Sequence, residues 1–158
     1  MAWTATTKPR NAKRQGGGNI VALRMTASTT IYKGDMVRID VTTGLVTGML
    51  INASLATGDL FAGIAAETKT SPAAGTMYIN VYTTGTFEFK TADTAAVGNI
   101  GEKIYSDNAT NTTEGGNYCL LATAGHAFPI GTCIDFPSTA LRLVRIDGFA
   151  CHINGVAP

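Results

Sequence analysis

Few residues of this 158-residue chain are of the types that enzymes use for proton transfer or metal binding. Its two histidines are His126 and His152, and its three cysteines are Cys119, Cys133 and Cys151. No two cysteines have the Cys-x-x-Cys spacing of a zinc or redox site, and an odd number argues against a disulfide framework. We therefore expect small buried cysteines in a reducing compartment and histidines in loops or interfaces.

Motifs that bind phosphate or activate a nucleophile are also missing from the sequence. There is no P-loop, no Gly-x-Ser-x-Gly elbow and no His-Glu-x-x-His. The run Gly16–Gly18 precedes a predicted strand, whereas a Rossmann motif needs a strand before its glycines and a helix after them. Segment 107–111 is rich in oxygen atoms but lacks the ligand spacing of an EF-hand. We expect no enzyme, no cofactor, no metal and no small-molecule substrate.

Charge is distributed unevenly along the chain, although the net charge is only +1. No acid occurs before Asp35, so the first 24 residues carry +5, from Lys8, Arg10, Lys13, Arg14 and Arg24. The remaining seven basic and eleven acidic side chains give −4. A basic segment can neutralise phosphates, but the rest of the chain has neither a basic excess nor an RRM-like aromatic motif. We therefore do not expect nucleic acid to be the partner.

Residues 1–18 are predicted to form an extended N-terminal arm. Pro9 and Gly16–Gly18 disfavour regular structure there, and the segment has no apolar periodicity. Trp3 is the only tryptophan of the chain. We expect a partner to hold the arm through an aromatic anchor and charge-assisted contacts, made by Trp3, Lys8, Arg10, Lys13 and Arg14. The alternative is that the arm folds back on its own domain.

Residues 19–147 are predicted to form the body, and residues 148–158 a C-terminal tail. Short apolar runs are separated by Gly, Asn, Asp and Thr, a rhythm typical of a compact antiparallel β-barrel or sandwich. We expect one short helix at most, over 91–97. Runs 77–82 and 86–90 are predicted to pair as a hairpin across the turn at 83–85. The other predicted strands cover 20–25, 36–41, 45–51, 60–66, 103–105, 118–121, 131–136 and 140–147.

A weak internal repeat supports this β-rich interpretation. Gly34–Asp40 resembles Gly101–Asp107, because in both a glycine and an acid precede an alternating strand that ends on Asp. About thirty residues later, Phe61–Ala65 resembles Pro129–Ile134, each with a central glycine. A glycine inside a strand marks a bulge or a close approach of two backbones. We expect two similar halves that pair around one core.

Composition favours assembly over catalysis. Charged residues make up 15% of the chain, against about 25% in ordinary soluble domains, and threonine and glycine are abundant. Such a surface suits a protein whose faces are covered by other proteins. The sequence has no run of about 18 apolar residues and no signal-peptide pattern, so we expect synthesis in a cytoplasm and no membrane partner.

The body resembles the capsid decoration, or cement, proteins of tailed-phage heads. The matching stretches are the Gly-Asp strand start, the Gly-centred apolar strand, the Gly-x-Phe strand, the Gly-acid strand with Tyr and the late Ile-Gly strand, at 33–37, 60–65, 85–89, 101–107 and 130–134. The resemblance covers roughly residues 19–147. It implies a β-tulip-like barrel or sandwich that assembles as a homotrimer on the outer surface of the virion head.

The resemblance also implies a structural function. Such a protein clamps neighbouring major capsid proteins and stabilises the shell. The alternative is another virion or surface β-module that binds a receptor or glycan through an exposed aromatic groove, for which Tyr78, Tyr82 and Tyr105 are the candidates. We expect core packing to be the role of at least two of these tyrosines.

Overall fold

The computed structural model describes residues 13–14, 19–48, 59–74, 77–91, 95–106, 118–120 and 129–148. Within these ranges the chain forms strands and one 3-10 turn, η1 (Val97–Asn99), so the predicted all-β fold is confirmed. The strands are β1 (Lys13–Arg14), β2 (Ile20–Arg24), β3 (Thr30–Ile31), β4 (Met36–Ile39), β5 (Val46–Gly48), β6 (Leu60–Ala65), β7 (Lys69–Thr70), β8 (Tyr78–Tyr82), β9 (Thr84–Thr91), β10 (Lys103–Ser106), β11 (Tyr118–Leu120), β12 (Pro129–Ser138) and β13 (Leu141–Asp147).

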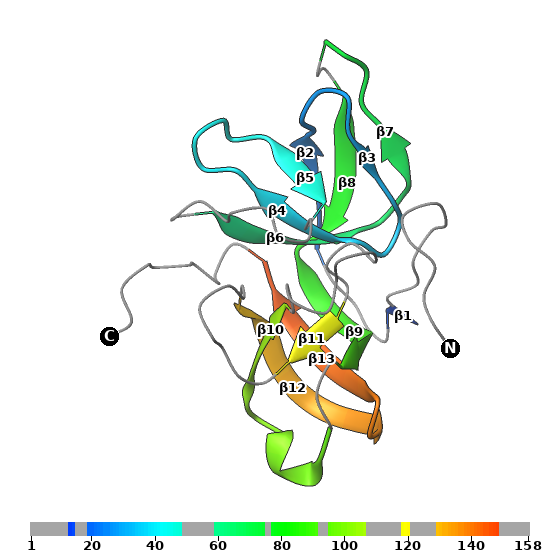
Figure 1. Ribbon diagram of the computed structural model, residues 1–158, viewed down its shortest axis with the longest axis vertical. Helices are drawn as coiled ribbons and strands as arrows, with labels where there is room; N and C mark the ends of the chain where they lie inside the picture. The colour runs from blue at the N-terminus through cyan, green and yellow to red at the C-terminus, as the bar shows by residue number, and fades with distance from the viewer. Residues whose placement is uncertain are drawn as a thin grey trace.

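The strands form two curled sheets, one above the other in Figure 1, and a separate antiparallel pair of β3 and β7. The upper sheet has the order β2-β8-β6-β4-β5, and all of its strand pairs are antiparallel. Its two outer strands meet where Met25, directly after β2, forms a parallel bridge with Val46 of β5. The N–H of Thr26 also donates to the carbonyl of Val46 at 2.8 Å. This sheet therefore closes into a first small barrel.

The lower sheet closes more completely. Its strands follow the order β9-β13-β12-β10-β11, and β11 returns to pair with β9. The closing pair is parallel and joins Tyr118 to Lys90 and Cys119 to Thr91, while the other pairs are antiparallel. These five strands form a second barrel, to which β1 is added at the outside of β9.

The two barrels have the same topology and register. Strands β2, β8, β6, β4 and β5 correspond in order to β9, β13, β12, β10 and β11, and each ring closes with a parallel contact. Val37 pairs with Gly63 directly before a bulge, as Ile104 pairs with Gly131 directly before a bulge. The predicted internal repeat is therefore confirmed, and it extends over five strands in each half.

The central glycines of the repeat mark a close approach of backbones. A Cβ at Gly63 would collide with the carbonyl oxygen of Tyr82, and a Cβ at Gly131 would collide with that of Arg145. Tyr82 and Arg145 lie on β8 and β13, which correspond to each other. Only glycine lets the neighbouring strands pack this closely at the bulge.

The predicted single core is wrong, because the buried residues form two clusters. The first barrel is filled by Met25, Ile31, Val37, Val46, Ala62, Ala65, Ile79 and Val81. The second cluster combines residues of the second barrel with three from β4 and β6: Phe87, Phe89, Ile104, Ile130, Cys133, Val144 and Ile146, with Met36, Phe61 and Ile64. Side chains alternate across a strand, so β6 sends Phe61 to one cluster and Ala62 to the other. This explains why β6 is a nearly continuous apolar run.

One local prediction is also wrong. Strands β8 and β9 do not pair as a hairpin; only Thr83 separates them, and the chain passes there from the first barrel to the second (Figure 1). The expectation of one short helix at most holds for the described residues: within 91–97, Thr91 ends β9, Ala95 and Ala96 are not helical, and η1 begins at Val97. Gly148, at the start of the predicted tail, is buried against the body and donates its N–H to the carbonyl of Thr83 at 2.6 Å.

Candidate interaction surface

The arm enters the fold as a strand. Lys13 lies opposite Glu88 and Arg14 opposite Phe87, in antiparallel register on β9. These two residues therefore lie against their own body, as the alternative interpretation of the arm expected for the whole segment. The other predicted arm contacts, Trp3, Lys8 and Arg10, are outside the described residues.

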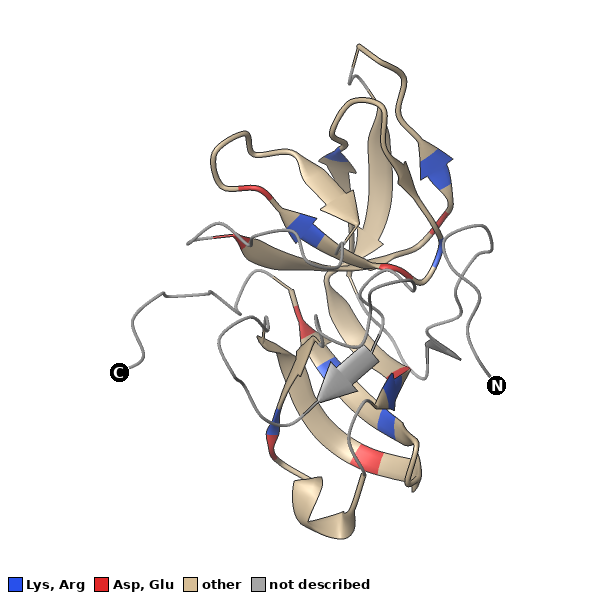
Figure 2. Cartoon of the chain, viewed as in Figure 1, with Lys and Arg blue, Asp and Glu red and all other residues tan. Residues whose placement is uncertain are grey.

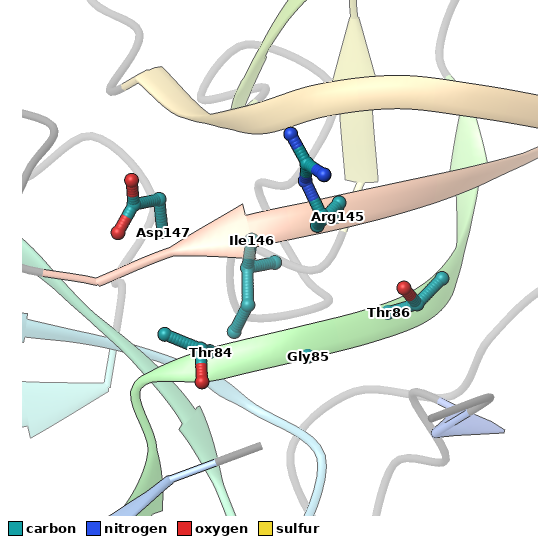
Figure 3. Close-up of a pocket in the computed structure, with 6 residues that line it drawn as sticks. All are labelled: Thr84, Gly85, Thr86, Arg145, Ile146 and Asp147. Atoms are coloured by element: carbon teal, nitrogen blue, oxygen red, sulfur yellow. The ribbon is translucent and has the colours of Figure 1, made fainter. Parts of the chain in front are cut away.

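A shallow hollow lies next to this strand, at the start of β9 and the end of β13. It has a volume of about 360 Å³ and is lined by Thr84, Gly85, Thr86, Arg145, Ile146 and Asp147. Figure 3 shows Arg145 and Asp147 projecting from the same side of β13, while Ile146 points to the other side, into the core. The hydroxyls, guanidinium and carboxylate can bind the polar groups of an extended peptide.

Exposed apolar side chains gather at two places outside the hollow. The first, here called the β2 patch, consists of Ile20 and Tyr78, which are 52% and 56% exposed and lie on one face of the β2–β8 pair, at its two ends; Val21, 40% exposed, points to the other face. Ile20 and Val21 belong to β2, and Tyr78 lies on the neighbouring β8. Exposed apolar patches on folded proteins commonly mark interaction sites.

The second group, here called the η1 patch, lies at the lower tip of the second barrel in Figure 1. It consists of Val97, Ile100 and Ile134, with Val97 exposed to 72%. Two backbone hydrogen bonds hold this loop to β12: the N–H of Gly101 donates to Cys133 at 2.8 Å, and the N–H of Cys133 donates to Glu102 at 3.0 Å. The loop is thus a firmly attached part of the barrel.

A buried arginine supports the same loop. Arg142 of β13 has no exposed surface, and its guanidinium donates to the hydroxyl of Thr91 and to the side-chain oxygen of Asn99, the latter at 3.1 Å. That oxygen of Asn99 also accepts the N–H of Ala96 at 2.8 Å. Arg142 therefore connects β9, β13 and η1 and holds the η1 patch in place. The alternating sequence of this strand gave no sign of a buried charge.

Cys133 is the one predicted buried cysteine whose side chain the structure describes, and it is buried in the second cluster. Burial raises the pKa of its thiol above the ordinary value, with a smaller opposing effect from the nearby Arg142. This agrees with the prediction of a structural cysteine. Among the described residues no group of three or more His, Cys, Asp and Glu side chains is placed to hold a metal ion.

Charges of both signs are interspersed over the described parts of both barrels (Figure 2). In the first barrel, Arg38 and Asp59 form a largely buried ion pair with 2.7 Å between Nη1 and Oδ2. The backbone N–H of Asn80 donates to Glu67 at 3.0 Å and, with the nearby Lys69, holds the pKa of Glu67 below its ordinary value. These groups fix strands and turns rather than gathering around one cavity.

The three candidate tyrosines do not share one surface. Tyr78 is exposed, whereas Tyr82 packs on the second core cluster with its ring 5.8 Å from that of Phe87. Tyr105 is half-buried on β10 of the second barrel. His126, His152 and segment 107–111 lie outside the described residues.

Comparisons with known proteins give no relative: no family model matches this chain, and neither does any curated protein. Among the described residues, no helix has the length and apolar character needed to cross a membrane.

Proposed function

We propose that this chain is a structural virion protein that binds the outside of a tailed-phage head and clamps neighbouring major capsid proteins. The observation that carries the proposal is the exposed apolar η1 patch, which is held rigidly on the second barrel. Lys13 and Arg14 pair with their own β9, so the residues before Lys13 are the part of the arm left for a neighbour. Because β1 is attached to β9, the residues before Lys13 can bind a neighbouring subunit without movement of the body. The resemblance of residues 19–147 to decoration proteins supports the same role. Because such proteins assemble as homotrimers, we propose that this chain does so as well.

The two closed barrels suit a protein that works by binding energy. Closed rings leave few open strand edges, and β6 buries side chains on both faces, so the barrels share a wall. A stiff body transmits the tension of a pressurised shell between its contacts. Repeated weak contacts on a lattice then add up through avidity.

We assign the η1 patch to the shell contact. Val97, Ile100 and Ile134 are exposed at one tip, and the two backbone hydrogen bonds to β12 and the guanidinium of Arg142 hold that tip rigid. Rigid apolar contacts lose little conformational entropy on binding, which favours affinity.

The test is binding to purified heads that lack the protein, measured by co-sedimentation. Deletion of residues 1–18 should leave the far-ultraviolet circular dichroism of the barrels in place and weaken binding by tenfold or more, and Val97→Lys should weaken it as well. Val41→Lys, at an exposed turn of the first barrel, is the matched control and should bind as the native chain does. Undiminished binding after the arm deletion would refute the role of the arm.

A further inference from the structure

The two barrels differ at the outer edge of one pair of equivalent strands, β2 and β9. Tyr82 of β8 and Arg145 of β13 are equivalent positions, because each faces the central glycine of its barrel. Ile20 pairs with Tyr82 and Thr86 pairs with Arg145, so Ile20 corresponds to Thr86, and Ala22 of β2 corresponds to Glu88 of β9. In the second barrel, β1 covers the outer side of β9 at Glu88. The corresponding side of β2 at 20–22, here called the β2 edge, has no such strand among the described residues.

The backbone of the β2 edge is oriented for pairing. The carbonyl of Asn80 accepts the N–H of Ala66 at 2.8 Å, and the N–H of Asn80 donates to Glu67, so both groups of Asn80 face away from β2. Ala22 lies opposite Asn80. In an antiparallel ladder such a pair points its N–H and C=O groups outward on both strands. Ala22 therefore presents a donor and an acceptor at the open edge.

Residues 20–22 of this edge, before the charged Arg24, carry none of the usual protection against pairing. Natural edge strands carry lysine, proline or a bulge, whereas the residues here are Ile20, Val21 and Ala22, all exposed. The open stretch is short, because Met25 already bridges Val46 where β5 begins. The edge thus accepts a short extended segment, as β9 accepts the two residues of β1.

We propose that the β2 edge binds residues 3–7 of the N-terminal arm of a second copy of this chain, by strand addition. This segment, Trp-Thr-Ala-Thr-Thr, is uncharged and rich in residues that favour strands. The basic residues that follow it, from Lys8 onward, are less suitable for this edge, because their charge would be repelled by Arg24, which is exposed at the end of β2. Trp3 supplies an aromatic side chain to cover the β2 patch.

The direction of β1 favours a second copy over the same chain. Lys13 lies opposite Glu88 and Arg14 opposite Phe87, so the N-terminal end of β1 is directed toward the Lys90 end of β9, whereas β2 starts beside the other end of β9. The twelve residues before Lys13 span up to about 40 Å when extended, enough to reach a neighbour. The inference rests on the homotrimer of the proposed function and deepens it by naming the contact between copies: residues 3–7 bind a second copy, which leaves the basic residues after them for the shell. Self-association is measured without heads, so its failure is distinct from a failure to bind the shell.

Sedimentation equilibrium of the full chain over a wide concentration range tests the proposal. We expect reversible self-association, weakened by about tenfold or more in Trp3→Ala and in Ala22→Pro. Proline removes an N–H that points outward, so Ala22→Pro preserves the pairing of β2 with β8, which circular dichroism verifies. Val41→Lys is the matched control and should associate as the native chain does. A chain that stays monomeric at every concentration, or associates equally well as Ala22→Pro, refutes the proposal.

Two further measurements identify the occupant even if a variant fails to fold. Hydrogen exchange at the amide of Ala22 should become slower as protein concentration rises. Protection that is already complete in dilute monomer would mean that the chain's own arm fills the edge, and protection that requires added shell protein would mean a foreign strand; either result overturns the proposal. Isotopically labelled Ala5→Cys mixed with unlabelled Ala22→Cys should form disulfide cross-links between labelled and unlabelled chains. The control mixes the same labelled Ala5→Cys with unlabelled Val97→Cys and should give far fewer such cross-links.

Discussion

Replacing Gly131 by alanine tests the shared architecture of the two barrels. The added Cβ would collide with the backbone carbonyl of Arg145, which belongs to a paired strand and cannot rotate away. Overpacking of this kind costs about 1–3 kcal/mol, and alanine recovers about 0.4–1 kcal/mol by restricting the unfolded chain. We expect the free energy of unfolding of Gly131→Ala to fall by about 1–2 kcal/mol.

The equivalent change in the first barrel, Gly63→Ala, should cost more. Its Cβ would meet the carbonyl of Tyr82, and its φ of +143° adds backbone strain of about 1–3 kcal/mol for any residue with a side chain. Gly48→Ala is the control, because nothing lies within 4 Å of the place that its Cβ would occupy. Urea unfolding followed by far-ultraviolet circular dichroism measures all three. If Gly131→Ala is as stable as Gly48→Ala, the close approach of β12 to the carbonyl of Arg145 is wrong.

Three further outcomes follow from single side chains. Asp59→Asn should lower the free energy of unfolding by about 3 kcal/mol in the same urea assay, because it leaves the guanidinium of Arg38 buried without its counter-charge; a loss under about 1 kcal/mol would contradict this. The pKa of Glu67 is lowered in the fold, so its stabilisation is complete above the ordinary carboxyl pKa and is lost as pH falls through the lowered value. The native chain should therefore lose more stability than Glu67→Gln between about pH 5 and pH 3, and equal losses would refute the effect. Cys133 should resist iodoacetamide at about pH 8 in the folded chain and react after unfolding, as mass spectrometry of its peptide would show; rapid labelling of the native protein would contradict its burial.

Alternation of apolar residues was enough to place most strands of the body. Val37 and Ile39, for example, flank the polar Arg38 in an alternating pattern that favours a strand, and β4 forms there, although both of its faces are buried. The repeat was also visible, because the glycine-acid start and the glycine-centred strand recur with similar spacing. Its full extent was not visible, since β2 and β9 share position and register but hardly any sequence.

Long-range pairing explains the errors. The Thr-Thr-Gly sequence at 83–85 favours a turn, yet β8 pairs with β2 and β6, and β9 pairs with β13, β11 and β1. The alanines near 95 favour helix locally, but the N–H of Ala95 bonds to the carbonyl of Thr139 instead. The alternating sequence around Arg142 does not predict its burial, because the hydrogen bonds that permit burial come from Thr91 and Asn99, which lie in distant segments.

The candidate surface was predicted less completely than the fold. Sequence singled out the basic arm, and the structure gives that arm a start on β9 at Lys13 and Arg14. The β2 edge and the η1 patch were not predicted, because an exposed apolar residue in a strand looks the same in sequence as a buried one. The uncovered side of β2 follows from its equivalence to β9 in the repeat, since among the described residues only β9 carries an added strand.

Cryo-electron microscopy of purified heads, first stripped of this protein and then saturated with it, tests the proposed function most directly. The heads come from the tailed phage that encodes this chain under the proposed function. We expect density for paired barrels on the outer surface at regular lattice positions, with the arm running from β9 to a neighbouring subunit. Heads that remain bare at saturating protein, or density confined to the inside of the shell, would contradict it.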